Sequence, residues 1–306
     1  MNGVRVNGAN RNDVRGNGVP VNGGRVNDVP VNGGRVDDVR GTPSPPGGLR
    51  SAVRSADGPP PLLVIAHGSR DARHAATVRE LSAAAAAARP GLRVEAAFLD
   101  LCGPAVPEAV ARLAADGVRE AVALPLLLTR AFHARTDVPA ALRRAAAEQP
   151  GVRLRPAGVL GPSPLLVAAL ERRLAEAGLR EADRATTSVV LAAAGSSDPA
   201  ANAVVERVAR DWRRTAGWAE VLAAHASASG PRTEDAVRAL RARGARRIAV
   251  APYVVAPGFL PDRIAAGARA AGADLLAPVL GAAPELAALL LRRYAEALAA
   301  APVGAG

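Results

Sequence analysis

Cysteine, lysine, aromatic residues and long apolar runs are scarce or missing in this sequence of 306 residues. Its single cysteine, Cys102, excludes a disulfide framework and a cysteine-based zinc cluster. Aromatic residues make up only 2%, too few for a protein that stacks single-stranded bases. No apolar run approaches the roughly 18 residues of a membrane-spanning helix, and the first thirty residues contain no apolar signal segment. We therefore expect a soluble, cytoplasmic protein without nucleic acid or membrane partners.

Arginine and small apolar residues dominate what is present. All 39 basic residues are arginines, and the formal net charge is +11. Such a balance suits an anionic partner. Apolar residues make up 49%, enough for a folded core built from Ala, Val and Leu.

Residues 1–60 differ from the rest of the chain. The decapeptide VNGGRVNDVP at residues 21–30 returns as VNGGRVDDVR at residues 31–40. Sequence so rich in Gly, Asn and Pro buries too little apolar surface to offset the entropy cost of ordering it. We therefore expect residues 1–60 to be a disordered low-complexity tail, with a tether or an arm for anionic surfaces as the alternative.

From residue 61 onward, short apolar runs alternate with helical patterns rich in Ala, Arg and Glu. Alternation of this kind predicts βα units and a parallel sheet that is covered on both faces. The predicted strands are residues 62–66, 93–98, 121–127 and 152–156, and the predicted helices are residues 74–88, 104–115, 138–148 and 164–177.

The second half of the chain repeats the first at an offset of 127 residues. The repeated residues include Gly68-Ser69 with Gly195-Ser196, Asp71 with Asp198, Gly103-Pro104 with Gly230-Pro231, and Gly117 with Gly244. The repeat predicts two similar α/β domains, over residues 61–180 and 181–306. In both copies the Ser and Asp of the first turn are expected to cap the helix that follows.

Two histidines occur in the first copy only. His67 stands opposite Ala194, and His133 stands opposite Leu260. Both follow predicted strands at their carboxyl ends, the edge where open α/β sheets bind ligands. Two imidazoles from neighbouring loops can bind a divalent metal, and Asp100 offers a third, oxygen ligand. The alternative is that both histidines only cap or pack.

The other two histidines are expected to lie outside this site. His74 falls within the first predicted helix, where we expect a solvated side chain. His225 stands opposite Phe98, and we expect a hydrogen-bonded histidine of the second domain, with a pocket role as the alternative.

Other enzyme classes fit these turns poorly. A histidine phosphatase needs Arg directly before its His-Gly pair, where this chain has Ala66. A phosphate-binding P-loop needs lysine, and a serine hydrolase needs a G-x-S-x-G turn; the sequence has neither.

The motifs AHGSRD at residues 66–71, AFLDL at 97–101, PLLL at 125–128 and H-x-x-x-D-V-P at 133–139 resemble those of the sirohydrochlorin chelatase family, also called CbiX/SirB. The resemblance covers roughly residues 61–300. It implies the chelatase fold: two tandem flavodoxin-like parallel-sheet α/β domains related by duplication, of which the second carries no metal centre.

The resemblance also implies an activity: insertion of a divalent metal into sirohydrochlorin, a polycarboxylate tetrapyrrole. The metal, Fe²⁺ for siroheme or Co²⁺ for cobalamin, would be a substrate rather than a bound cofactor, and we favour Fe²⁺. His67 and His133 would bind it and take part in catalysis. Asp100 would do so at the position where relatives place glutamate, one methylene longer. A carrier of metal or tetrapyrrole that does not catalyse insertion is the alternative of another class.

Five residues beside these ligands are expected to contact the substrate: Ser69, Arg70, Arg130, Phe132 and Arg135. The arginine fork suits carboxylates, and an aromatic ring can stack on a macrocycle. A solvated rim is the alternative for each arginine, and core packing is the alternative for Phe132. Because one chain supplies both domains, we expect a monomer.

Overall fold

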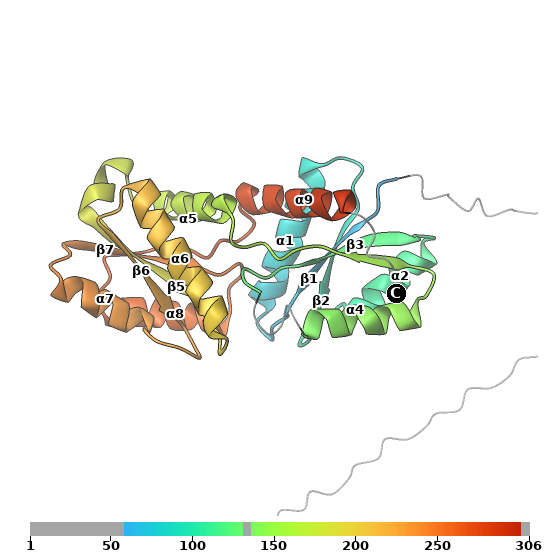
Figure 1. Cartoon of the computed structure of the whole chain (residues 1–306), viewed down its shortest axis with the longest axis horizontal. Helices are drawn as coiled ribbons and strands as arrows, with labels where there is room; N and C mark the ends of the chain where they lie inside the picture. Colours follow the sequence, from blue (N-terminus) through green and yellow to red (C-terminus); the bar gives the residue numbers. More distant parts are fainter. Residues whose placement is uncertain (1–57, 131–135, 301–306) are drawn as a thin grey trace, which may run out of the picture. The chain divides into compact units, whose positions relative to one another are not determined.

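The structure is a computed structural model that describes residues 58–130 and 136–300 (Figure 1). All of these residues belong to one compact unit. The tail predicted for residues 1–60 lies almost entirely outside the described residues. Within the described ranges, no helix is both long enough and apolar enough to cross a membrane.

The first half forms a parallel sheet of four strands in the order β2-β1-β3-β4. This is a flavodoxin-like order: β2 is added on one side of β1, and β3 and β4 are added on the other side. Its central strand has the sequence LLVIA and is buried along its whole length, as expected for a strand covered on both faces. The elements are β1 (Leu62–Ala66), α1 (Ala72–Ala88), β2 (Val94–Phe98), α2 (Val106–Ala115), β3 (Glu120–Pro125), α4 (Asp137–Glu148), β4 (Arg153–Pro156) and α5 (Pro164–Glu176).

The second half repeats this sheet in the order β6-β5-β7-β8, again with parallel pairing throughout. The expected α/β fold of two duplicated parallel sheets is confirmed. The elements are the 3₁₀ turn η1 (Glu181–Thr186), β5 (Thr187–Ala193), α6 (Pro199–Ala216), β6 (Glu220–His225), α7 (Thr233–Ala242), β7 (Arg247–Tyr253), α8 (Phe259–Ala270), β8 (Leu275–Leu276) and α9 (Pro284–Ala299).

The predicted caps are present in both copies. Asp71 accepts a hydrogen bond from the N–H of Arg73 at the start of α1, 2.9 Å away, and Asp198 accepts one from Ala200 at the start of α6, 2.9 Å away. In each copy the preceding serine accepts the N–H of the capping aspartate at 3.0 Å. The two strand-to-helix turns therefore have the same local structure.

The last helix of each half packs against the other half. Residues of α1 and α9 share a core with β1 and β3, whereas α5 and α6 pack against β5 and β7 (Figure 1). Glu171 of α5 accepts the indole N–H groups of Trp212 and Trp218, at 2.5 and 3.2 Å. Arg293 of α9 donates to the carbonyl oxygens of Val159 and Leu160, at 2.9 and 3.0 Å.

This exchange joins the two sheets into one compact unit. The predicted boundary between two domains at residue 180 describes the sequence repeat and stays a prediction. Each sheet is covered partly by a helix from the other side of that boundary, the second sheet by α5 and the first by α9. The opposite faces are covered locally, the first sheet by α2 and α4 and the second by α7 and α8.

Candidate functional site

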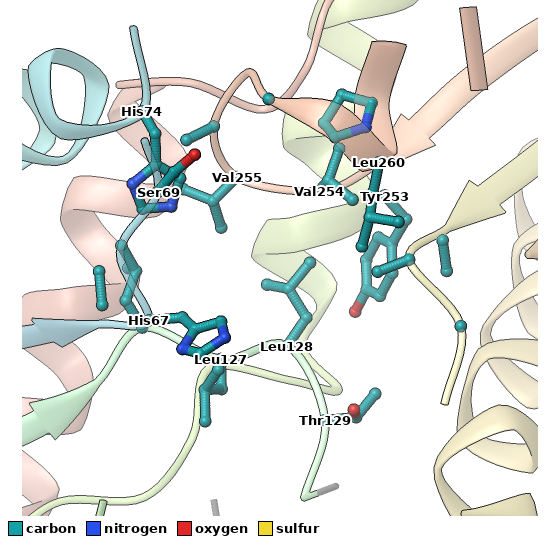
Figure 2. A pocket seen from close by; sticks show the side chains of 18 of the residues that line it. His67, Ser69, His74, Leu127, Leu128, Thr129, Tyr253, Val254, Val255 and Leu260 are labelled. Carbon is teal, nitrogen blue, oxygen red and sulfur yellow. The ribbon is translucent and has the colours of Figure 1, made fainter. Parts of the chain in front are cut away.

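A cavity of about 380 Å³ lies where the central strands of both sheets end. Strands β1, β3, β5 and β7 all point their carboxyl ends at it, the edge at which open α/β sheets bind ligands. Its wall is formed by residues 66–69 and 126–129 of the first half, by residues 193–196 and 253–261 of the second, and by His74, Ala201, Asn202 and Val205 (Figure 2).

His67 directly follows β1, and its side chain forms part of this wall (Figure 2). The turn needs Gly68, which has a φ of +98° and whose Cβ, if present, would collide with the carbonyl oxygen of Asp100. The carbonyl of His67 accepts the N–H of Asp100 at 3.0 Å, as that of Ala194 accepts the N–H of Ser227. The backbone is thus alike in the two halves, and only the first half adds an imidazole.

Asp100 is exposed and does not belong to the cavity wall. Its Oδ1 accepts the N–H of Leu101 at 2.7 Å. His133 lies outside the described residues. Within the described ranges, no group of three His, Cys, Asp or Glu side chains is placed to hold a metal ion. The predicted ligand set of His67, His133 and Asp100 therefore stays a prediction, with His67 alone placed on the cavity.

The predicted substrate contacts divide in the same way. Ser69 lines the cavity, and its hydroxyl oxygen accepts the N–H of Asp71. Arg70 and Arg130 are exposed and lie outside the cavity wall. Phe132 and Arg135 lie outside the described residues.

His74 also lines the cavity, so the expectation of a solvated side chain was wrong. The imidazole is half-buried, its ring centroid lies 6.3 Å from that of Phe98, and its Nδ1 is buried without a hydrogen-bond partner in the described structure. Burial lowers the pKa of His74, and the nearby His67 lowers it further. The sequence did contain a signal for this role: at the offset of 127 residues His74 corresponds to Ala201, so His74, like His67 and His133, is found only in the first copy.

Tyr253 is a second residue that the sequence did not point to. It ends β7, opposite Leu126 in the repeat, and its ring forms part of the cavity wall (Figure 2). The side chain is 2% exposed, and its hydroxyl has no partner among the described residues. Burial raises the pKa of the phenol, so the hydroxyl stays protonated and can donate a hydrogen bond.

The described wall of the cavity is largely apolar and contains neither a carboxylate nor a guanidinium. His67, His74 and Tyr253 are its titratable side chains. Phe259 stands at this wall with 73% of its surface exposed. An apolar cavity of this volume with a few polar groups is the usual form of a small-molecule binding site.

Comparison with known proteins identifies relatives that are similar in sequence over most of the described residues. The family model CbiX matches residues 61–177 and 188–297. The sirohydrochlorin cobaltochelatase of Priestia megaterium is 27% identical over 206 residues, a match that covers 66% of this chain and 66% of the relative. The sirohydrochlorin ferrochelatase of Bacillus subtilis is 27% identical over 210 residues and is covered over 77% of its length.

A solved structure has the same fold. SirB from Bacillus subtilis, determined with Fe³⁺, matches with a TM-score of 0.68 and 25% identity, over 78% of this chain and 95% of SirB. A CbiX described as the terminal enzyme of siroheme biosynthesis in denitrifying bacteria matches with a TM-score of 0.58 and 22% identity, over 78% of this chain and all of that structure.

Proposed function

This chain belongs to the CbiX family, and we propose that it inserts a divalent metal ion into sirohydrochlorin. The observation that carries the proposal is the position of His67 in an apolar cavity at the carboxyl ends of both sheets. The names of the relatives, sirohydrochlorin cobaltochelatase and sirohydrochlorin ferrochelatase, supply the substrate class.

The chemistry requires a weakly held metal and an acceptor for protons. As M²⁺ enters the macrocycle, two pyrrole N–H protons leave, so the charge is balanced. Imidazole nitrogens bind borderline metals such as Fe²⁺ and Co²⁺. We propose that His67 binds the incoming ion together with His133 and Asp100, and that an incomplete ligand set leaves positions open for the macrocycle nitrogens.

The side chains around His67 supply the remaining functions. His74 is near His67 and is uncharged at neutral pH, because its burial lowers its pKa. A neutral imidazole in the wall can accept a proton from the macrocycle. The hydroxyl of Tyr253 can donate a hydrogen bond to a substrate oxygen from the opposite side of the cavity. We propose that Ser69, Arg70, Arg130, Phe132 and Arg135 contact the substrate at its periphery.

We favour Fe²⁺ as the metal, with Co²⁺ as the alternative. The named relatives include both ferrochelatases and cobaltochelatases, and SirB structures contain Fe³⁺ in one case and cobalt in another. Two imidazoles and a carboxylate accept either ion, so selectivity would follow metal supply. We propose that the enzyme is a monomer, since one chain already contributes residues of both halves to the cavity. We also propose that it is cytoplasmic and has no permanently bound cofactor.

Anaerobic absorbance spectroscopy tests the proposal. Purified protein is mixed with sirohydrochlorin and either Fe²⁺ or Co²⁺, and metal insertion is followed beside a protein-free control. We expect insertion faster than in the control, with the ratio of the two rates reporting the preferred metal. A spectral change on binding sirohydrochlorin without faster insertion would instead establish a carrier and overturn the enzymatic assignment.

A further inference from the structure

A second cavity, of about 320 Å³, lies in the second half and shares no residue with the first. It is formed by the end of β6, the start of α7 and the middle of α8, the two helices that cover the face of the second sheet opposite α5 and α6. The polar side chains that line it belong to His225, Arg232, Thr233, Glu234, Arg238 and Arg263.

Three of these side chains have buried polar atoms without a hydrogen-bond partner in the described structure. They are Nδ1 of His225, Nη1 of Arg232 and Oγ1 of Thr233, and the hydroxyl of nearby Ser229 is in the same state. His225 is 1% exposed and Thr233 is 2% exposed. Leaving buried donors unpaired is costly. The cluster therefore points to a ligand that pairs with them, which rotation about single side-chain bonds would allow.

The charge of this cavity favours an anion. Three guanidinium groups line it against one carboxylate, that of Glu234. The neighbouring Asp235 does not line the cavity; it accepts the backbone N–H of Arg232 at 3.2 Å and pairs with Arg238 at 3.4 Å. This still leaves the guanidinium groups of Arg232 and Arg263 against Glu234. The cavity also adjoins the amino end of α7, where the helix dipole favours negative charge. Arg238 and Arg263 are exposed and can close over a ligand.

The internal repeat shows that the fold does not require these polar groups. At the same offset of 127 residues, the first half has Phe98 in place of His225, Ala105 in place of Arg232 and Val106 in place of Thr233. Phe98 and Val106 are fully buried apolar side chains. The second half thus has no counterpart of His67, but it has polar side chains at positions where the first half has buried apolar ones.

We propose that this second cavity binds a small oxyanion of the phosphate class, as free phosphate or as a phosphate ester. Guanidinium forks, a hydroxyl and an imidazole N–H are the groups that hold tetrahedral oxyanions. The site is distinct from the metal-insertion cavity and does not depend on the function proposed for it.

Thermal unfolding of the full chain tests this site. Sodium phosphate replaces sodium chloride at constant ionic strength, for the wild type and for Thr233→Val and His225→Phe, which introduce the residues of the first half. Arg213→Ala on α6 is the control, since Arg213 is exposed and outside the cavity. We expect phosphate to raise the midpoint of the wild type and of the control, and above the dissociation constant the rise should follow the logarithm of the phosphate concentration. We expect Thr233→Val to weaken the apparent affinity by about tenfold.

Thr233→Val keeps the test interpretable, because removal of an unpaired buried hydroxyl leaves the chain in chloride at least as stable as the wild type. If His225→Phe does not fold, Thr233→Val alone decides. Titration calorimetry with inorganic phosphate and with glycerol 3-phosphate then separates the two sources, and binding of either supports the site. An unchanged wild-type midpoint would show that phosphate does not bind, and an equal rise in Thr233→Val would show a general anion effect that does not depend on this site. Either result would overturn the proposal.

Discussion

Arg73 of α1 and Asp262 of α8 form an ion pair between the two halves of the chain, with Nη2 and Oδ2 2.8 Å apart. Asp71 orients the Arg73 side chain: its Oδ1 accepts a hydrogen bond from Nε at 3.1 Å, and its Oδ2 accepts one from Nη2 at 2.6 Å. The hydrogen bonds from Arg73 hold the pKa of Asp71 below its ordinary value. Both partners stand next to residues of the first cavity, His74 on one side and Pro261 on the other.

We expect Asp262→Asn to change substrate binding more than stability. The pair is exposed, and exposed pairs contribute little to the free energy of unfolding. Loss of this link beside the cavity should raise KM for sirohydrochlorin by a factor of about 2 to 5 with little change in kcat. The control is Asp211→Asn, which removes the exposed pair with Arg214 at 3.0 Å. Equal KM values in the two variants would contradict a role for the Arg73–Asp262 pair.

Tyr253→Phe should leave the thermal midpoint unchanged or raise it, because the hydroxyl has no described partner to lose. If the hydroxyl donates to the substrate, KM for sirohydrochlorin should rise up to about tenfold. Tyr294→Phe provides the opposite control. Its hydroxyl donates to the carbonyl of Pro60 at 2.7 Å, and it does not line the cavity. That variant should lose about 1 kcal/mol of stability and keep its KM. An unchanged KM in Tyr253→Phe would contradict the binding role.

Gly68→Ala should destabilise the protein more than Gly91→Ala. Both glycines have positive φ, +98° and +85°, so each substitution carries backbone strain of about 1 to 3 kcal/mol. Only at Gly68 would the new Cβ also meet the carbonyl of Asp100, whereas the space at Gly91 is open. Urea unfolding of the two variants gives the comparison. Equal losses would show that the close approach beside His67 is not a constraint.

His225 should make the protein less stable in mild acid. Burial lowers the pKa of its imidazole from 6.5; Glu206 opposes this effect and Arg232 adds to it. The unfolded chain therefore takes up a proton first as the pH falls below about 6.5, and the free energy of unfolding decreases from there towards the folded-state pKa. In phosphate-free buffer, His225→Phe should reduce this decrease between pH 7.5 and 5. An identical decrease in the wild type and the variant would show that His225 is not the cause.

The local pattern of the sequence predicted the elements of the first half closely. The strand over residues 62–66 was predicted in full, and the helix over 74–88 is observed as Ala72–Ala88. Strand β3 was predicted to run to residue 127 but ends at Pro125, and the apolar residues that follow, Leu126 and Leu127, line the cavity. Apolar runs and turn residues carry this information locally.

Information that depends on distant packing was not available from the sequence. The exchange of α5 and α9 is set by contacts such as Glu171 with Trp212, which no local pattern shows. His74 reaches the cavity because α1 begins directly after the Gly68 turn, a question of helix orientation. Hydrogen-bond partners are likewise invisible in the sequence, so the unpaired Nδ1 of His225 contradicted the expectation of a satisfied histidine.

The most direct test of the account is the initial rate of Fe²⁺ insertion into sirohydrochlorin, measured anaerobically for the wild type and for His67→Ala. Thermal unfolding of both proteins shows whether the variant is folded, and a protein-free reaction sets the baseline. We predict that the wild type exceeds this baseline and that His67→Ala, although folded, falls to it. A folded His67→Ala protein with the wild-type rate would contradict the central claim that metal insertion takes place at His67.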